Sequence, residues 1–486
     1  MSPRYRNIAI IGTGPSGISA IRALKDEKVF NTIRVFERQD RPGGMWNITE
    51  PDPFPITVTD GKVDIGRNRT TTIPSKFPQF TVPASEDLSA RTAARESLDS
   101  NIVADLMYFT HTPMPEINSA VSVERIGPAN PTRPCLAISS YLQNLATEYL
   151  PLISFSTTVE KVEKVLDTKD SGQAKWTLTL RRPYEIRPGQ LLDYWWQEKF
   201  DAVVVATGHY HVPFIPDIPG LEETAKSHPW VLEHSKAFRS ANNYVGRRVV
   251  IVGGSISAGD VVTDIHLVVR GPLIISQRHG SGSETIWQMA NTIRKPGVKS
   301  MTADSSSTVR VTFSDDSTVD HVDRVIFGTG YQISYPFLSP DPVTASNRLS
   351  GFYQHIFKMG DPSLAVVGQL KYSPLRAYEY QAVAVARYFA GREAKAFSLP
   401  SLHDQQEWEA KRVESNGPGS DFHAIKMELK DYLTFLRDFA GPADPASDSY
   451  ELPALGDSWL VTTMHFFELL EAYWKSEAPK QQNAKL

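Results

Sequence analysis

The sequence predicts an α/β protein built from two Rossmann-like dinucleotide-binding domains, with the second domain inserted in the first. Two short apolar runs each lead into a turn of small residues, at residues 12–17 and 253–258, and a helical pattern follows each turn. An Asp, an apolar strand and Thr-Gly then recur at the same spacing, at residues 201–208 and 323–330. We therefore expect the first domain to wrap the second, with the remaining tail returning to the first.

Length and composition exclude several other classes. The chain has 486 residues, enough for about two or three domains. Lys and Arg number 51 and Asp and Glu number 55, so the net charge of −4 argues against nucleic-acid binding as the main role. The lone cysteine, Cys135, excludes a disulfide framework, a dithiol redox pair and a thiolate metal cluster, and we expect no metal site.

The sequence also bears on the compartment. No run of about 18 apolar residues occurs, so we expect no membrane span. The apolar clusters of residues 459–470 are broken by His465 and Glu468, which indicates a packed amphipathic helix. A single cysteine is compatible with a reduced intracellular compartment, and we expect a cytoplasmic protein.

The first turn has the full context of a dinucleotide-binding motif. An apolar strand leads into Gly-Thr-Gly-Pro-Ser-Gly at residues 12–17, a helical run follows, and the next strand ends in Glu37. Gly12 permits the tight turn, Gly14 lets the backbone approach a pyrophosphate, and Gly17 lets the helix pack closely. The helix N-terminus favours phosphate, and the Glu37 carboxylate can accept hydrogen bonds from ribose hydroxyls.

The second turn repeats this pattern with two differences. It reads Gly-Gly-Ser-Ile-Ser-Ala at residues 253–258, so the third and sixth positions are Ser255 and Ala258, which are small but not glycine. The strand after it is followed by Arg278 where an acid would favour NAD. Arginine suits a ribose 2′-phosphate, so the second ligand is predicted to be NADP(H) rather than NAD(H).

These patterns give the domain boundaries. We expect a first dinucleotide-binding domain over residues 1–212, containing an irregular Pro- and Thr-rich insert at residues 49–95. The second domain covers residues 213–330. Residues 331–486 return to the first domain and add C-terminal helices, one of them predicted over residues 387–411.

Two adjacent dinucleotide sites indicate hydride transfer from NADPH to a flavin. A disulfide reductase would pass the electrons on to a cysteine pair, which Cys135 alone cannot form. Oxygen is therefore the expected electron acceptor.

Four segments carry a family resemblance, and the first of them is the glycine-rich turn at residues 12–17. They are Gly-Thr-Gly-Pro-Ser-Gly at 12–17, Gly-Gly-Met-Trp at 43–46, Ala-Thr-Gly-His-Tyr at 206–210 before Val-Pro-Phe-Ile-Pro at 212–216, and Phe-Gly-Thr-Gly-Tyr at 327–331. Together they resemble the flavin-containing monooxygenase family of class B flavoprotein monooxygenases, above all its soluble fungal members. The resemblance covers about residues 6–392 and implies that the first domain binds FAD and the second NADP.

The resemblance also implies roles for individual residues. An Asn stands beside the flavin in the family, which makes Asn101 the candidate catalytic residue, although the family's proline two positions later is Val103 here. Val159 would meet the adenine through its backbone. The full set of predicted cofactor-binding residues is Gly12, Gly14, Pro15, Ser16, Gly17, Glu37, Gly44, Met45, Trp46, Asn101, Ile102, Val159, Gly253, Ser255, Ile256, Ser257, Ala258 and Arg278.

The function that the resemblance implies is NADPH- and FAD-dependent monooxygenation. One oxygen atom of O2 would pass through a C4a-hydroperoxyflavin to a nucleophilic nitrogen or sulfur of a small molecule, with water excluded. The expected substrates are an amine, an indole or a sulfur compound, as in N,N-dimethylaniline monooxygenase-like enzymes of secondary metabolism. The family's habit implies a homodimer.

Three alternatives stay open. A Baeyer–Villiger enzyme would convert a ketone to an ester, a flavin oxidase would leave no oxygen atom in its product, and a non-catalytic redox sensor would not oxidise NADPH. His234 and Phe238 match the end of the family's signature, and an ending in Phe favours heteroatom oxidation over the Baeyer–Villiger branch. His228 and Trp230 depart from the Phe and Gly of that signature.

Overall fold

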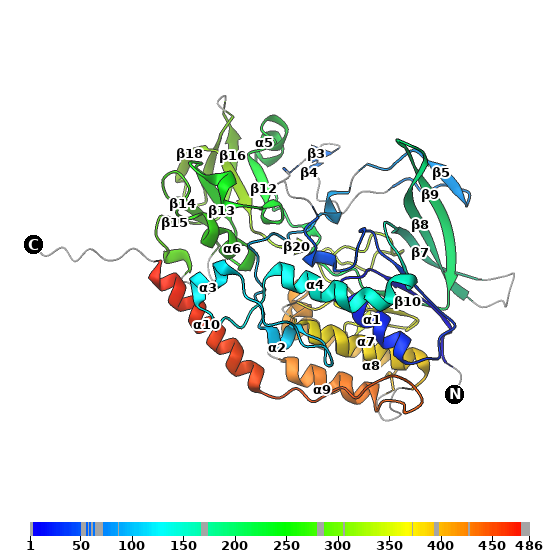
Figure 1. Cartoon of the computed structure of the whole chain (residues 1–486). Coiled ribbons are helices and arrows are strands. Elements are labelled where there is room, and N and C mark those ends of the chain that lie inside the picture. Colours follow the sequence, from blue (N-terminus) through cyan, green and yellow to red (C-terminus); the bar gives the residue numbers. More distant parts are fainter. Residues whose placement is uncertain are drawn as a thin grey trace, which may run out of the picture.

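A computed structural model describes most of the chain, and its two dinucleotide-binding folds lie next to each other (Figure 1). Parts of the predicted insert 49–95 lie outside the described residues. The described residues are 3–49, 55–56, 58–59, 62–63, 71–85, 87–166, 174–278, 286–304, 307–371, 373–392, 398–425 and 428–477.

The first fold is a seven-stranded sheet in the order β21-β22-β23-β10-β1-β2-β6. Its central strands β1 and β10 are buried apolar runs, as parallel strands covered on both faces require. β1 pairs in parallel with β2 and β10, and β10 pairs in parallel with β23. The strands are β1 (Asn7–Ile11), β2 (Thr32–Phe36), β6 (Ile153–Ser154), β10 (Ala202–Val205), β21 (Phe352–Tyr353), β22 (Phe357–Lys358) and β23 (Leu364–Val366).

The second fold is a five-stranded parallel sheet in the order β12-β19-β13-β14-β15. All its strands come between β10 and β23 in the chain, so the second fold is inserted in the first, and the predicted fold class is confirmed. The domain boundaries themselves stay a prediction. The strands are β12 (Leu232–His234), β13 (Val249–Val252), β14 (Leu273–Ser276), β15 (Thr292–Lys295) and β19 (Arg324–Phe327).

Smaller antiparallel sheets accompany the two folds. An antiparallel pair of short strands, β11 and β20, joins the chain that leaves the first fold to the chain that returns. A hairpin precedes the closing strand of each fold, β8 and β9 before β10, and β17 and β18 before β19. The strands are β3 (Val58–Thr59), β4 (Lys62–Val63), β5 (Gln79–Thr81), β7 (Thr158–Leu166), β8 (Ala174–Arg187), β9 (Gln190–Phe200), β11 (Val212–Pro213), β16 (Val298–Ala303), β17 (Val309–Phe313), β18 (Thr318–Val322) and β20 (Tyr331–Gln332).

Helices cover the sheets, and α1, α7 and α9 build the largest apolar core against the first one. The helix predicted over residues 387–411 is wrong, because α7 ends at Gly391, which has a left-handed φ of +72°, and α8 starts only after Ser401. Within the described residues no helix is long and apolar enough to span a membrane. The α-helices are α1 (Pro15–Asp26), α2 (Ala104–Met107), α3 (Ala120–Ile126), α4 (Cys135–Ala146), α5 (Leu221–Ser227), α6 (Ile256–Ile265), α7 (Leu375–Ala390), α8 (Leu402–Asn416), α9 (Leu429–Ala440) and α10 (Ser458–Ser476).

Candidate active site

A cavity of about 1520 Å³ lies where the two folds face each other. The first residues after three parallel strands line it: Gly12 after β1, Glu37 after β2 and Ala206 after β10. Ile256, the first residue of α6, lines it from the second fold. Ligands of open α/β sheets bind at this carboxyl edge, so the cavity, which residues of both glycine-rich turns line, is the candidate ligand site.

The first turn is shaped by close backbone contacts. Gly12 has a φ of +101°, and a Cβ there would lie 2.6 Å from the Ala206 carbonyl oxygen. A Cβ on Gly44 would lie 2.7 Å from the Gly14 Cα, so the segment 43–46 packs directly onto the turn. Side chains are therefore excluded from both sides of the turn, which leaves its backbone open to a ligand.

Glu37 is buried and already fixed by the protein. One carboxylate oxygen accepts hydrogen bonds from the backbone N and the Oγ1 of Thr13, both at 2.7 Å, and the other accepts from the backbone N of Gln39 at 2.8 Å. These donors hold the carboxylate at the cavity wall, where a ribose hydroxyl can approach it.

Asn101 is an exposed residue of the cavity wall. Its amide forms no hydrogen bond with any other described residue, so both its donors are available to a ligand. The neighbouring Ser100 fixes the backbone beside Asn101. The backbone N of Ser100 donates to the Arg133 carbonyl at 2.8 Å, and the Oγ of Ser100 donates to the Ile102 carbonyl at 2.8 Å. Val103, where the family has proline, caps α2 with φ −64° and ψ 147°, a backbone shape that proline also adopts.

The second turn reaches the cavity through its middle residues. Ile256 and Ser257 line the cavity, whereas Gly253 packs against the strand end: a Cβ on Gly253 would lie 2.3 Å from the Gly328 carbonyl oxygen. Arg278 is exposed and lies outside the cavity wall.

The structure thus brings most predicted site residues together. The predicted residues that line the cavity are Gly12, Gly14, Pro15, Ser16, Glu37, Gly44, Met45, Trp46, Asn101, Ile102, Val159, Ile256 and Ser257. Those outside its wall are Gly17, Gly253, Ser255, Ala258 and Arg278.

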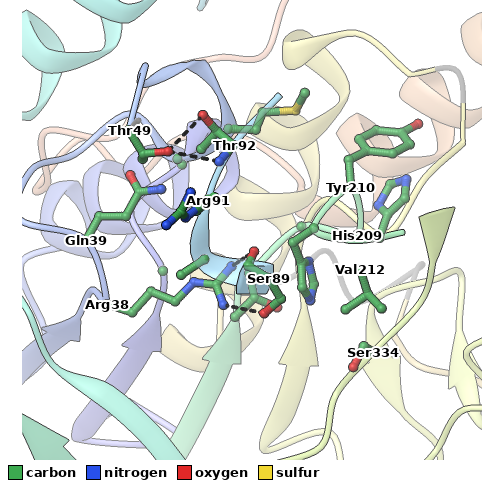
Figure 2. Close-up of a pocket in the computed structure, with 18 of the residues that line it drawn as sticks. Arg38, Gln39, Thr49, Ser89, Arg91, Thr92, His209, Tyr210, Val212 and Ser334 are labelled. Carbon is green, nitrogen blue, oxygen red and sulfur yellow. Dashed lines mark hydrogen bonds between the residues drawn. The ribbon is translucent and has the colours of Figure 1, made fainter. Parts of the chain in front are cut away.

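Several polar residues of the cavity were not predicted. Figure 2 shows Arg38 hydrogen-bonded to Ser89, and Thr49 hydrogen-bonded to Thr92, on this wall. Arg38 follows Glu37 directly, so its position could have been inferred from the sequence. The remaining unpredicted basic and polar lining includes Gln39, Arg91, Arg95, His209, Tyr210, Asp260 and Tyr331.

Burial shifts the pKa of several cavity residues, among them His209 and Asp260. It lowers the pKa of His209 to about 4, so this ring is neutral near pH 7. It raises the pKa of Asp260 to about 6, and the positive charge of Arg95 opposes this shift. The cavity therefore combines cationic arginines with a buried carboxyl group, that of Asp260, which keeps its proton to a higher pH than an exposed aspartate does.

The segment after β12 joins the two folds beside the cavity. The Nζ of Lys236 donates to the carbonyl oxygens of Ser89 at 3.1 Å and of His211 at 2.6 Å. The Nδ1 of His234 accepts from the Lys236 backbone N, so its Nε2 carries the proton and donates to the Gly330 carbonyl at 3.0 Å. His234 is fully engaged in these contacts and lies outside the cavity wall.

The residues present fit a large polar cofactor. The Nε1 of Trp46 and the Oγ1 of Thr207 are buried on cavity-lining residues, and neither has a hydrogen-bond partner within the described residues. Buried polar atoms without a partner are costly, so a ligand that supplies the partner is favoured. The glycine cradle around Gly14 and the helix N-terminus beside it suit a pyrophosphate.

Two dinucleotide folds that open onto one cavity define an oxidoreductase that holds a flavin and a nicotinamide dinucleotide together. The chain belongs to the flavin-binding monooxygenase-like family, whose model matches residues 90–294 and 286–468. The NAD(P)-binding Rossmann-like domain model matches residues 10–66. The protein is accordingly an oxidoreductase of the flavin-containing monooxygenase type, with FAD and NADPH as cofactors.

The chain is also similar to individual flavin-containing monooxygenases. The chain is 27% identical over 498 residues to the flavin-containing monooxygenase iboF of Amanita muscaria, covering 92% of this chain and 89% of the relative. It is 23% identical over 503 residues to ustF2 of Aspergillus flavus, covering 94% and 96%. Among solved structures, S-allyl-L-cysteine S-oxygenase from Allium sativum has the same fold, with a TM-score of 0.70, 24% identity and coverage of 98% and 95%.

Proposed function

We propose that this protein uses NADPH, FAD and O2 to place one oxygen atom on a nucleophilic nitrogen or sulfur of a small molecule. The observation that carries the proposal is Asn101, whose amide faces the shared cavity of the two folds without a hydrogen bond to any described residue. An amide donates hydrogen bonds but has no titratable proton, so it can hold a reactive oxygen species without discharging it. The substrate class also agrees with that of the Allium enzyme, which is an S-oxygenase of S-allyl-L-cysteine.

We propose roles for the predicted site residues on the same basis. The turn 12–17 would hold the FAD pyrophosphate, Glu37 the ribose, and Val159 the adenine. Gly44, Met45 and Trp46 would line the flavin end of that site, and the turn 253–258 would hold NADPH from the opposite side.

The chain's own contribution is binding, orientation and exclusion of water. FAD, once reduced by NADPH, supplies the chemistry of oxygen activation. The substrate brings its own nucleophile, so the site needs no catalytic triad and no paired carboxylates. The lowered pKa of His209 keeps its ring neutral, so neither this ring nor the amide of Asn101 acts as an acid near neutral pH.

The proposal is tested with a small panel: a tertiary amine, an indole, a thioether and a cyclic ketone, each under isotopically labelled oxygen. We expect substrate-stimulated NADPH oxidation and one labelled oxygen atom in the amine, indole or sulfur product. An ester from the ketone would indicate a Baeyer–Villiger enzyme instead, and an unlabelled oxidised product would indicate an oxidase. Bound FAD that NADPH never reduces would indicate a non-catalytic protein.

Variants of Asn101 test the residue that carries the proposal. Asn101→Ala should keep bound FAD and NADPH oxidation but divert about 90% of the reducing equivalents to hydrogen peroxide, because a donor that is worth tenfold or more is missing. Asn243→Ala, an exposed asparagine outside the cavity, is the control. Equal oxygenated product from both variants would contradict the assignment.

A further inference from the structure

An ion-pair cluster at the edge of the cavity connects α6 to the segment that carries Asn101. Asp264, near the C-terminal end of α6, is at its centre, with a side chain only 8% exposed. One carboxylate oxygen lies 2.8 Å from Arg125 of α3, and the other lies 3.5 Å from Arg95. The Oγ of Ser97 is also 3.5 Å from that second oxygen.

Arg95 links this cluster to the cavity. Its side chain is 8% exposed, its Nε donates to the Ser97 Oγ at 3.2 Å, and its guanidinium lies 4.9 Å from the centre of the Phe238 ring. Arg95 also lines the cavity, on the same segment as Asn101. The later part of this segment is fixed to the start of α4, where the backbone N of Cys135 donates to the Leu98 carbonyl at 2.7 Å.

The segment 95–101 is therefore held at two places of different kinds. Its later half is hydrogen-bonded to the first fold, whereas its beginning rests on a helix of the second fold through a buried charge pair. Losing one partner of such a pair leaves an uncompensated buried charge, so removal of the Asp264 carboxylate should disturb the placement of Arg95.

The same helix begins at the nicotinamide-dinucleotide turn. Ser257 lines the cavity in the first turn of α6, and Asp264 follows about 10 Å further along the axis. A helix of this length moves as a unit, so a ligand that fixes its N-terminus also fixes Asp264.

We propose that Asp264 is a positioning residue that, through Arg95, couples nicotinamide-dinucleotide binding at α6 to the placement of Asn101. The inference rests on the proposed function of the cavity. Thermodynamic linkage makes the coupling reciprocal: an ordered segment 95–101 tightens dinucleotide binding, and a bound dinucleotide orders the segment. In turnover, this coupling holds Asn101 in place for as long as the dinucleotide stays bound.

The test compares the FAD-loaded wild type with Asp264→Asn, with the charge-preserving Asp264→Glu, and with Glu409→Gln as a matched control. Glu409 is a partly buried carboxylate, 17% exposed, that accepts from Arg348 at 2.7 Å and from the Gly351 backbone N at 2.9 Å, away from the cavity. Hydrogen exchange of residues 95–101 is measured with and without NADP⁺, together with the NADP⁺ affinity and the hydrogen peroxide released per NADPH.

We expect NADP⁺ to slow exchange of residues 95–101 in the wild type and in Glu409→Gln. In Asp264→Asn this slowing disappears, NADP⁺ binds about tenfold more weakly, and peroxide release rises. Asp264→Glu recovers at least part of each effect. Equal slowing in Asp264→Asn and the wild type overturns the inference while leaving the proposed function intact. A wild type that binds neither FAD nor NADP⁺ overturns both.

Discussion

The two glycine-rich turns occupy equivalent places in their folds but solve the same packing problem differently. In the first turn the helix carries the glycine: a Cβ on Gly17 would lie 2.0 Å from the Gly12 carbonyl oxygen and 3.8 Å from the Ala206 Cβ. In the second turn the helix carries Ala258, and the strand end facing it carries the glycine: a Cβ on Gly328 would lie 2.8 Å from the Ala258 Cβ. At the contact between helix and strand end, the glycine is thus on the helix in the first fold and at the strand end in the second.

A second difference concerns charge. Ile11 pairs with Phe36 and Val252 pairs with Ser276, so Glu37 and Gln277 are equivalent residues at the ends of their strands. The first fold thus presents a carboxylate at this position and the second a neutral amide. A carboxylate suits ribose hydroxyls, whereas an amide does not repel a 2′-phosphate. The second turn has therefore kept the motif's shape while changing its chemistry.

The largest expected effect comes from Gly17→Ala. The added methyl would overlap a backbone oxygen that cannot move without distorting the first turn, so we expect a loss of about 3 kcal/mol of stability and of most bound FAD. Denaturant unfolding and the flavin content of the purified protein measure both.

Gly14→Ala is the matched control within the same turn, because its Cβ would lie at an ordinary 3.6 Å from the Gly44 Cα. It should weaken FAD binding while leaving the unfolding midpoint of the FAD-free protein near that of the FAD-free wild type. Equal unfolding midpoints for the two variants would contradict the packing account.

The next largest effect is expected at Gly328, the strand-end glycine that faces Ala258 of the second turn. Gly328→Ala should cost about 2 kcal/mol, because its methyl would lie 2.8 Å from the Ala258 methyl and 2.9 Å from the Ala258 Cα. Adding Ala258→Gly removes only the first of these contacts, so it should recover part of that loss. A double-mutant cycle on the unfolding free energy measures the coupling. Purely additive effects would show that the two residues do not share one space.

A smaller effect tests the change in charge. Gln277→Glu restores an acid beside the second turn, so the preference for NADPH over NADH, measured as the ratio of kcat/KM, should fall about tenfold. Arg278→Gln should lower the same ratio by a similar or smaller amount, because Arg278 is exposed and its charge is screened. An unchanged ratio in both variants would show that neither Gln277 nor Arg278 contributes to recognition of the 2′-phosphate.

The smallest effect is expected for Ala258→Gly alone. It creates little space and adds one glycine to α6, so it should cost about 1 kcal/mol and leave NADPH binding unchanged. Thermal unfolding with and without NADP⁺ measures this, and a loss of several kcal/mol would contradict the comparison with Gly17.

The sequence predicted the features that depend on neighbours in the chain. The roles of Gly12 and Glu37 follow from one strand, one turn and the next strand, and the repeated closing strand predicted the inserted fold. The packing of Gly328 against Ala258 could not be predicted, because it depends on which strand end faces α6. Arg95 was not predicted because its segment has no periodic pattern. The break at Gly391 was not predicted because a left-handed residue ends the helix although the flanking residues favour a helix.

The central claim is that the two turns hold FAD and NADPH close enough for hydride transfer. Mixing the purified, FAD-loaded protein with NADPH in the absence of oxygen tests this most directly. We predict complete and saturable loss of the visible flavin absorbance, with NADH requiring about tenfold or higher concentrations. Bound flavin that neither nucleotide reduces would contradict the account.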